Sequence, residues 1–561
     1  MEKLRERVER RMSQLRTERQ KSWDPTWRDL SDFILPNVGD ALRQEVNDGR
    51  RRDQHIINST ATRAVTVLQG GMSSGLTSAS RPWFKLATPD PGLMEFGPVK
   101  VWMHQAEQAL REVFVKSNLY NVLPTVYGEL GVFGTAPMAA MPDNQGLVRF
   151  YPFTVGSYYL ANSSRQITDT LYRELKLTAR QLAQQFGEDA LSVKTRQLLA
   201  SNPEAWVDIC HAIEPNDDRK AGLDDNRNMP FRSVYWEKAS DRAQVLRVSG
   251  FKQNPVMAPR WEVNGQSVYG HGPGIVALGD TKALQTLEKR KLEMVEKGVR
   301  PPMTAPESLR NQRMSILPGD VTYVNVGQGM QGFVPTMVVD PSWVSVLRGE
   351  IQAHEQRIDA AFFVDLFLMI SQMDTVRTAM EIAARKEEKM LMLGPVLERL
   401  NDELLDPLID RVFGMMLEQS APRWAGLLPG KPMLPPPPEE LAGIDLRVEY
   451  ISILAQAQKA LGVSSIERTV AFAGNLVGVA PEVLDKLNLE QAIDEYAAMI
   501  GTTPTIIRSD DEVAQIRQAR AQAQAQQQQM EQAGQAIQAA KLLSETQITD
   551  DTALGALTGA V

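Results

Sequence analysis

Cysteine, histidine and long hydrophobic runs are all scarce in this chain of 561 residues, and each shortage excludes a class of protein. The one cysteine, Cys210, leaves no intrachain disulfide, which fits folding in a reducing compartment. Five scattered histidines beside one cysteine do not make a zinc framework, so we expect no metal and no other cofactor. The longest apolar stretch, residues 360–370, is too short to cross a bilayer and contains Asp365.

Positive charge is also in short supply. Lysine and arginine number 61 against 69 aspartates and glutamates, and this formal net charge of −8 excludes a generally basic nucleic-acid coat. The sequence is charged from Glu2 onward, so the apolar run of a signal peptide is not expected there. Hydrophobic residues make up 43% of the chain, which is enough for several packed modules at roughly 100–200 residues per domain.

The first 279 residues mix helical and strand-like patterns. Acidic and basic residues alternate at helical spacing over 2–21, which predicts a solvated helix with i,i+4 ion pairs. A nucleic-acid-binding arm is less favoured, because acids are interleaved throughout. Helices are also predicted over 58–79, with a break at Gly70-Gly71, and over 98–117, 122–141 and 178–200. Aromatic and β-branched residues predict strands over 148–161, 167–177, 231–238, 244–251 and 259–269.

A more distinctive order follows, namely a helix, a compact β insertion and a returning helix. Gly279-Asp280 opens a helix over 280–299 with Asp280 as its N-cap, and Pro301-Pro302 ends it. Residues 300–341 show strand patterns on both sides of a glycine-rich turn, and a second helix over 342–363 follows. The apolar face of the first helix is Leu284, Leu287, Leu292, Val295 and Val299, and that of the second is Val344, Leu347, Ile351, Ile358 and Phe362. This pattern predicts a two-helix stalk with a small tip.

The remaining residues are predicted to be mainly helical. A region with a polar loop, 364–376, leads into a long helix over 377–428, which Gly394-Pro395 and Pro407 should kink. Six prolines within 429–438 predict an extended, semi-rigid linker, and short helices follow over 439–508. The Ala- and Gln-rich tail, 509–561, fits either a packed helix or a disordered segment, and its lack of proline favours the helix.

No motif in the chain supports an enzyme. Residues 327–332 match G-x-G-x-x-G, but a strand-like Phe333-Val334-Pro335 follows where a dinucleotide site needs a helix. The sequence contains no G-x-x-x-x-G-K-[ST], which argues against an ATPase motor. Cys210 and His211 are chain neighbours, which rarely face each other as nucleophile and base. The acid pairs at 217–218, 224–225 and 510–511 lie in a polar loop or at a helix start, so we favour structural roles over a metal-dependent nuclease.

The order of these elements resembles that of the portal proteins, or head-to-tail connectors, of short-tailed bacteriophages. Four stretches carry the resemblance: GGMSSGLTSASRPWFKL at 70–86, RWEVNGQSVYGHGPGIVALGDTKALQTLEK at 260–289, LPGDVTYVN at 317–325, and the order helix, polar loop, kinked helix across 342–419. Together they span most of residues 20–420. His271 in YGHGPG stands where the family leads us to expect a basic residue, and the C-terminal 120 residues match only in composition.

The resemblance implies a helix-rich α+β fold built as a portal-type ring subunit. The mixed region 1–279 would be the wing, 280–299 and 342–363 the two stem helices, and 300–341 a small β clip. Residues 364–376 would contain the tunnel loop, and 377–428 would be a long kinked wing helix. The proline-rich linker, 429–438, would lead to a helical crown over 439–508 and a C-terminal barrel helix over 509–561.

The function that the resemblance implies is a ring-shaped DNA conduit at one capsid vertex, serving genome packaging, head-to-tail joining and genome ejection. A dodecameric ring is expected, which is assembled in the host bacterial cytoplasm and resides in the virion. The implied partners are double-stranded DNA, the terminase motor, a tail adaptor, and the major capsid and scaffolding proteins, with no membrane. No catalytic activity is implied.

Candidate site residues follow from this assignment. Gln372, Asp374 and Arg377 lie in or beside the tunnel loop, and Arg348 lies on the polar stripe of the second stem helix. Because rings of a negatively charged chain repel DNA in bulk, attraction has to come from a few local positions of this kind. An ion pair is the alternative role for Arg348. The clip residues expected to contact the motor or the adaptor are Arg310, Arg313 and Asp320.

Two other functions stay open on the sequence alone. Another virion structural protein, or an internal ejection protein, would be monomeric or filamentous, and the helix–clip–helix order argues against it. A DNA-packaging enzyme would hydrolyse ATP by itself, and the missing phosphate-binding loop argues against it.

Overall fold

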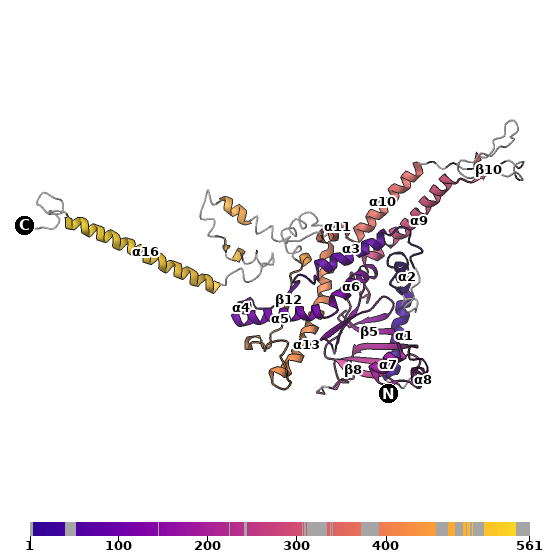
Figure 1. Ribbon diagram of the computed structural model, residues 1–561, viewed down its shortest axis with the longest axis horizontal. Coiled ribbons are helices and arrows are strands. Elements are labelled where there is room, and N and C mark those ends of the chain that lie inside the picture. Colours follow the sequence, from indigo (N-terminus) through magenta and orange to yellow (C-terminus); the bar gives the residue numbers. More distant parts are fainter. Residues whose placement is uncertain are drawn as a thin grey trace, which may run out of the picture. The chain divides into compact units, whose positions relative to one another are not determined.

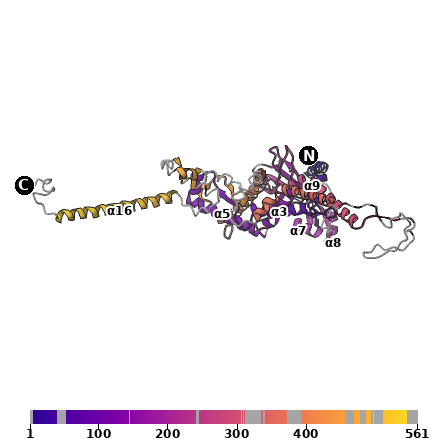
Figure 2. The ribbon, with the colours of Figure 1, turned by 90° about the horizontal axis from the view of Figure 1, so that it is seen from above.

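The computed structural model describes residues 4–39, 52–143, 145–220, 222–223, 225–240, 244–305, 307, 310, 334–336, 338, 340, 342–371, 392–455, 469–476, 486–489, 491–493, 496 and 510–545. The chain divides into two compact units, Met1–Ser465 and Ile466–Val561. Helices predominate and the sheets are antiparallel, which confirms the helix-rich α+β class (Figure 1, Figure 2).

A five-stranded antiparallel sheet in the first unit has helices on both faces. Its strands, in the order β4-β5-β6-β7-β8, are Tyr158–Asn162, Thr168–Thr178, Trp206–Pro215, Phe231–Glu237 and Arg247–Phe251. On one face, Cys210 and Trp236 lie in a core with Val8 and Met12 of α1 (Leu4–Ser22). On the other face, Ile209, Tyr235 and Leu246 pack with Leu182 and Leu191. Those two leucines come from the segment that holds α7 (Ala179–Phe186), η2 (Glu188–Ala190) and α8 (Val193–Ser201). Alternate residues of a strand point to opposite faces, so period-2 patterning serves both cores.

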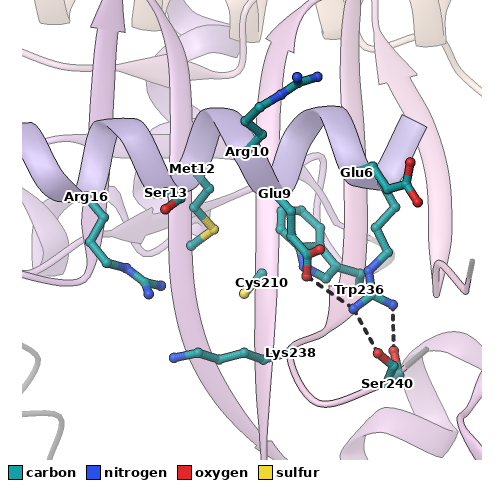
Figure 3. A pocket seen from close by; sticks show the side chains of 11 residues that line it. Glu6, Glu9, Arg10, Met12, Ser13, Arg16, Cys210, Trp236, Lys238 and Ser240 are labelled. Carbon is teal, nitrogen blue, oxygen red and sulfur yellow. Dashed lines mark hydrogen bonds and ion pairs between the residues drawn. The ribbon is translucent and has the colours of Figure 1, made fainter. Parts of the chain in front are cut away.

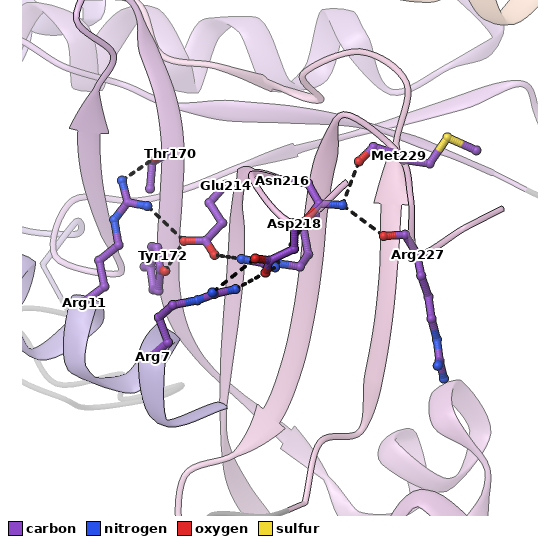
Figure 4. Close-up of polar contacts among 10 residues, drawn as sticks. Arg7, Arg11, Thr170, Tyr172, Glu214, Asn216, Asp218, Arg227 and Met229 are labelled. Atoms are coloured by element: carbon purple, nitrogen blue, oxygen red, sulfur yellow. Dashed lines mark hydrogen bonds and ion pairs between the residues drawn. The ribbon is translucent and has the colours of Figure 1, made fainter. Parts of the chain in front are cut away.

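Helix α1 confirms the predicted helix but not its solvated character. Its basic side chains reach the strands beneath it, where Arg11 Nη1 donates to Glu214 Oε2 at 3.0 Å and Arg7 pairs with Asp218 (Figure 4). Arg5 is 2% exposed and donates to the carbonyl oxygen of Glu237 at 3.0 Å. The predicted i,i+4 pairing is present between Arg5 and Glu9, but Arg7, Arg11 and Arg16 of the same helix pair with acids more than a hundred positions away. Sequence spacing along one helix cannot reveal such partners.

The main hydrophobic core of this unit combines a second sheet with several helices. The sheet has the order β3-β2-β9, with strands Val148–Pro152, Met138–Pro142 and Val256–Met257. The helices are α2 (Asp24–Phe33), α3 (Thr60–Gly75), α4 (Pro91–Glu95), α5 (Gly97–Lys116) and α6 (Leu119–Phe133). Trp27, Trp83, Phe114 and Phe133 are among its largest fully buried side chains.

Two helix predictions in this core differ from the structure. Helix α3 runs through Gly70-Gly71 without a break. Gly71 serves close packing within this helix and not a break, because a Cβ at this position would lie 2.4 Å from Phe367 of α11 (Val364–Ser371). The helix predicted to reach 141 ends at Phe133, since Gly134 adopts a left-handed φ of +76°, and residues 138–142 form β2 instead. A run of small, apolar residues has no periodicity that distinguishes a buried helix from a buried strand.

Two further ranges are also corrected. The helix predicted over 178–200 is split into α7 and α8, because Gly187 ends α7 with a φ of +83°. Residues 259–269 form no continuous strand; the segment makes isolated bridges, Thr135↔Arg260 and Glu262↔His271.

Helices α9 (Pro273–Val299) and α10 (Ser342–Ala361) pack side by side as a hairpin (Figure 1). Short paired strands, β10 (Met303–Thr304) and β11 (Val334–Pro335), join their far ends, and most residues between these strands lie outside the described residues. Helix α9 begins at Pro273 and not at Asp280, because proline suits a first helical turn. Asp280 lies within the helix and pairs with His354 Nδ1 of α10 at 2.8 Å.

The long helix predicted after the tunnel loop is described from residue 392 onward. It is helical over 392–400, passes through a π-helical turn, η4 (Asn401–Leu405), and continues as α13 (Asp406–Trp424). Pro407 lacks the N–H that would bond to the carbonyl of Glu403, and in the π-turn Asp406 N donates five residues back to Asn401 O. The irregularity expected at Pro407 therefore takes the form of a π-turn, while 392–400 is helical across Gly394-Pro395.

The proline-rich residues 429–438 lie against two helices of the first unit. Trp102 Nε1 of α5 donates to Pro435 O at 3.0 Å, and Trp424 Nε1 of α13 donates to Leu434 O at 2.6 Å. The N–H of Leu434 donates to Ser420 Oγ at 3.1 Å, and its side chain is fully buried. After η5 (Glu439–Leu441), strand β12 (Arg447–Tyr450) pairs antiparallel with β1 (Phe84–Ala87). The start of the 439–508 segment, predicted as short helices, therefore contains a strand and belongs to the first unit. The sequence did not indicate this strand, because the partner strand β1 is far away in the sequence.

The main described element of the second unit is α16 (Asp510–Glu545). Its side chains are mostly exposed where they are described, as expected for a sequence dominated by alanine and glutamine. The tail is therefore helical over 510–545, and its packing in a bundle stays a prediction.

Candidate docking and channel residues

The α9–α10 hairpin is buried at one end only. The buried residues of α9 lie between Pro273 and Gln285, and those of α10 are Ile351 and Ile358. Three residues of the predicted apolar face lie nearer the tip and are uncovered: Leu292 is 53%, Val295 45% and Val299 74% exposed. We call these three residues the hairpin stripe. An apolar row of this kind on a protruding helix is typical of a surface that another protein covers.

Polar contacts hold the buried end of the hairpin against the neighbouring helices. Lys282 Nζ of α9 pairs with Asp29 of α2 at 2.6 Å. Arg63 of α3 donates to Asp359 of α10 at 3.0 Å. The two hairpin helices are therefore tied to separate elements of the core, and we call this end the hairpin base.

Only some of the predicted site residues lie within the described part of the chain. Arg348 and Gln352 are exposed on α10, whereas Glu355 and Asp359 of the same polar stripe bond to this chain. Arg310 is exposed, and its backbone N–H donates to Glu307 O at 3.1 Å. The other candidates lie outside the described residues and stay predictions: Arg313, Asp320, Gln372, Asp374 and Arg377.

A polar groove of about 720 Å³ runs beside α1 (Figure 3). Met12, Cys210 and Trp236 contribute apolar surface to it, and charged side chains of α1 and Lys238, the residue after β7, surround them. Lys238 Nζ pairs with Glu174 at 2.9 Å, so at least part of the positive charge is neutralised internally. Burial raises the pKa of the Cys210 thiol to about 11, which keeps it protonated and a poor nucleophile at neutral pH. Cys210 is therefore a structural residue of this groove.

Cys210 and His211 point to opposite faces of the sheet, as their adjacency predicts. His211 is fully buried and stacks on Tyr235 with ring centroids 3.7 Å apart. Arg173 Nε donates to His211 Nδ1 at 3.1 Å, and His211 Nε2 lies 3.0 Å from Ser233 Oγ. Burial and the nearby Arg173 charge hold the pKa of this imidazole well below its usual range. His211 is therefore a neutral structural residue.

The described residues include no group of three or more His, Cys, Asp or Glu side chains placed to hold a metal ion. Asp218, a member of one predicted acid pair, is paired with Arg7 and Arg232. Residues 327–332 of the G-x-G-x-x-G match lie outside the described residues. Across the same described ranges, no helix has both the length and the hydropathy that a membrane span requires.

The sequence did not identify two residues that make several hydrogen bonds at the hairpin base, Asn58 and Gln285. Gln285 is 5% exposed and hydrogen-bonds to the backbone of residues 57 and 58. The only sign of Gln285 in the sequence is that a polar residue follows Leu284 on the apolar side of α9. Asn58 is marked in the sequence only as the first residue of an Asn-x-Thr sequon.

Known proteins match almost the whole chain. The family model described as bacteriophage head to tail connecting protein matches residues 5–507. The portal protein of Salmonella phage epsilon15 is 47% identical over 558 residues, which cover 99% of this chain and 98% of that protein. A probable portal protein of Bordetella phage BPP-1 is 40% identical over 513 residues, covering 91% of this chain and 90% of that protein. A chain from the virion of a native gene transfer agent particle aligns with a TM-score of 0.32 and 12% identity, covering 84% of this chain and 96% of that chain; this score supports no argument.

Proposed function

Because this chain belongs to the bacteriophage head-to-tail connecting proteins, the portal proteins, we propose that its copies close into a ring through which double-stranded DNA enters and leaves the capsid. The observation that carries this proposal is the 47% identity to a phage portal protein over nearly the full length of both chains. The family is structural, and its place is the portal vertex of the virion.

The hairpin stripe supports a contact between neighbouring copies. Leu292, Val295 and Val299 follow one side of α9, and this chain leaves them uncovered. In a head-to-tail contact, two different surfaces of identical chains meet. Such contacts close into a ring when the rotation from one chain to the next is a whole fraction of 360°. We assign the stripe to such a contact, and we propose that the closed ring is a dodecamer.

The helix and strand positions support the expected division of the chain. We assign residues 1–279 to the wing. We assign 280–299, which lie in α9, to the first stem helix and 342–363, which hold α10 and the two residues after it, to the second. Residues 300–341, which begin and end near the paired strands β10 and β11, are assigned to the clip. We assign 364–376 to the tunnel loop region. Its first part forms helix α11 (Val364–Ser371), which packs in the main core, so the loop itself would be 372–376. We assign 377–428 to the kinked wing helix, 439–508 to the crown and 509–561 to the barrel. The proline-rich 429–438 connects the last wing helix to the crown.

The partners follow from this division. The clip, with Arg310, Arg313 and Asp320, would bind the terminase motor during packaging and the tail adaptor afterwards. The wing would face the major capsid and scaffolding proteins during assembly in the host cytoplasm. Arg348 is exposed on α10, and it would face the channel together with Gln372 and Asp374 of the tunnel loop region and Arg377, the first residue of the wing helix.

Native mass spectrometry of the purified full chain, with class-averaged images, tests the proposal. We expect a closed ring with one dominant subunit number and a central channel. A stable monomer at micromolar concentration, or an open filament, would overturn it and favour an internal ejection protein. ATP hydrolysis by the pure protein would revive the enzyme alternative.

A further inference from the structure

Every polar atom of Asn58 is hydrogen-bonded at the hairpin base. Its Nδ2 donates to Glu288 Oε1 of α9 at 3.1 Å and to Glu355 Oε1 of α10 at 2.8 Å. Its Oδ1 accepts from the backbone N–H and the hydroxyl of Thr60, at 3.0 and 2.7 Å. Thr60 is the first residue of α3, so one side chain connects both hairpin helices to a helix of the main core.

Gln285 fixes the backbone of the same residue. Its Oε1 accepts from the N–H groups of Ile57 and Asn58 at 2.7 and 2.8 Å, and its Nε2 donates to Asn58 O at 2.8 Å. A single side chain thus bonds to the chain at 57–58 much as a neighbouring strand would. Because Gln285 is the last buried residue of α9, this bond set lies where the hairpin leaves the core.

The Asn58 amide also separates two like charges. Glu288 and Glu355 both place a carboxylate oxygen within 3.1 Å of the same nitrogen, and each takes one of its two hydrogens. Lys291 Nζ pairs with Glu288 at 2.5 Å and compensates one of the two charges. Without an N–H donor between them, the two carboxylates would repel each other and push α9 and α10 apart at the base.

The other contacts of the hairpin, the Lys282–Asp29 and Arg63–Asp359 pairs and the buried Leu284, Ile351 and Ile358, also lie at or near its base. Toward the tip, the described parts of α9 and α10 beyond Gln285 and Ile351 contribute no buried side chain. A small change of angle at the base is therefore amplified at the tip. Helix α9 rises about 1.5 Å per residue, so the tip lies about 20 Å from Gln285.

We propose that Asn58 is the positioning residue that sets the angle of the α9–α10 hairpin, and hence the place of its tip, relative to the core of the subunit. The consequence for partner binding depends on the proposed function, which assigns this tip to motor and adaptor docking. The angle itself does not depend on that assignment.

Asn58→Asp tests the proposal in the full-length ring. The substitution keeps the shape of the side chain but places a third carboxylate between Glu288 and Glu355. We expect amide hydrogen exchange in residues 57–60 and at the hairpin base to become about tenfold faster, as the loss of charge-assisted hydrogen bonds implies. Spin labels at Val346→Cys on α10 and Val193→Cys on α8, in rings diluted with unlabelled subunits, should show a broader distance distribution. Both positions are exposed, and Cys210 is replaced by serine in this background.

A compensating variant separates positioning from general destabilisation. In Asn58→Asp combined with Glu288→Gln and Glu355→Gln, the amides donate and the new carboxylate accepts, so the bonds are restored in reverse. We expect the wild-type distance distribution to return. Asn264→Asp, in an exposed turn, is the matched control and should leave the distribution unchanged.

The outcomes are distinguishable. A wild-type distance distribution in Asn58→Asp, or a failure of the compensating variant to restore it, would overturn the proposal. A broader distribution with unchanged terminase and adaptor binding would support the role of Asn58 and contradict the docking assignment of the tip. If Asn58→Asp does not fold, Asn58→Ser removes the bridge without adding charge, and an unchanged distribution in that variant would overturn the proposal equally.

Discussion

At the scale of single residues, Glu129 of α6 is the buried carboxyl group that bears most directly on stability. It is 2% exposed, its Oε2 accepts from Val155 N at 2.8 Å, and no hydrogen bond to Oε1 is present among the described residues. Burial raises the pKa of this carboxyl from 4.5 to about 8. The folded protein therefore holds a proton here that the unfolded chain releases at lower pH.

We predict that Glu129→Gln reduces the pH dependence of unfolding. A raised folded-state pKa means that the contribution of Glu129 is fully present below about pH 4.5 and is lost as the pH rises toward 8. The loss is on the order of 5 kcal/mol. The variant should match the wild type near pH 5 and be more stable at pH 8–9, as measured by chemical denaturation.

The matched control is Glu112→Gln on α5, whose side chain is 70% exposed. It should leave the pH profile of stability unchanged. A Glu129→Gln profile parallel to the wild type between pH 5 and 9 would show that Glu129 is ionised in the folded protein.

A second residue-scale prediction concerns the assigned tunnel loop. Asp374→Lys should leave ring assembly intact and add one positive charge per subunit to the channel. Each added phosphate contact releases counterions, so DNA retention should become stronger and more steeply dependent on salt. The measurement is DNA packaging or release against salt concentration, beside the wild type. Identical salt curves would mean that this residue does not line the channel.

At the scale of elements, the hairpin base and its tip are physically separable. The base is tied to α2 and α3 by ion pairs and hydrogen bonds, while β10 and β11 contact each other by a two-residue pairing. Replacing residues 303–337 with a short Gly/Ser bridge should therefore leave the wing folded and the ring assembled. Binding of the terminase motor and the tail adaptor should be lost, because the replaced segment is the assigned clip.

Two measurements check this element-scale prediction. Thermal unfolding of the replacement variant should stay within a few degrees of the wild type, and a pull-down should show no motor or adaptor. Retained binding would place the docking surface elsewhere on the subunit. Collapse of the fold would show that the clip stabilises the base.

At the scale of the whole molecule, we predict that the hairpin stripe is needed for ring assembly. Changing Leu292, Val295 and Val299 together to serine should weaken assembly strongly, because each apolar side chain that leaves an interface costs about 1–3 kcal/mol. The loss recurs at every contact around the ring. Native mass spectrometry should show smaller species at a protein concentration at which the wild type is fully assembled.

Val276→Ser is the control for this variant. Val276 lies on α9 outside the stripe and is 74% exposed, as much as Val299. It should leave assembly unchanged. Equal effects of the two variants, or normal assembly of the triple variant, would remove the stripe from the ring contact.

The sequence by itself determined the class, the family and the order of the major elements of this portal protein. Helical periodicity identified α5 and α10, and period-2 runs identified β5 and β7, because these patterns arise within a few neighbouring residues. The family followed from the order of whole segments, which the full-length matches confirm. The candidate channel and clip residues came from that family alone, and they stay predictions.

Only the tertiary structure decided which residues meet across the chain. The alternating charges of α1 indicated a solvated helix, but Arg11 pairs with Glu214 on a strand. Asn58 carried no structural signal in the sequence, but its side chain connects α3, α9 and α10. The left-handed Gly134 and the close contact of Gly71 with Phe367 likewise depend on neighbours distant in sequence. Hydrogen bonds and ion pairs act over about 3–4 Å in space, and a linear pattern carries no information about which distant segments come within that range.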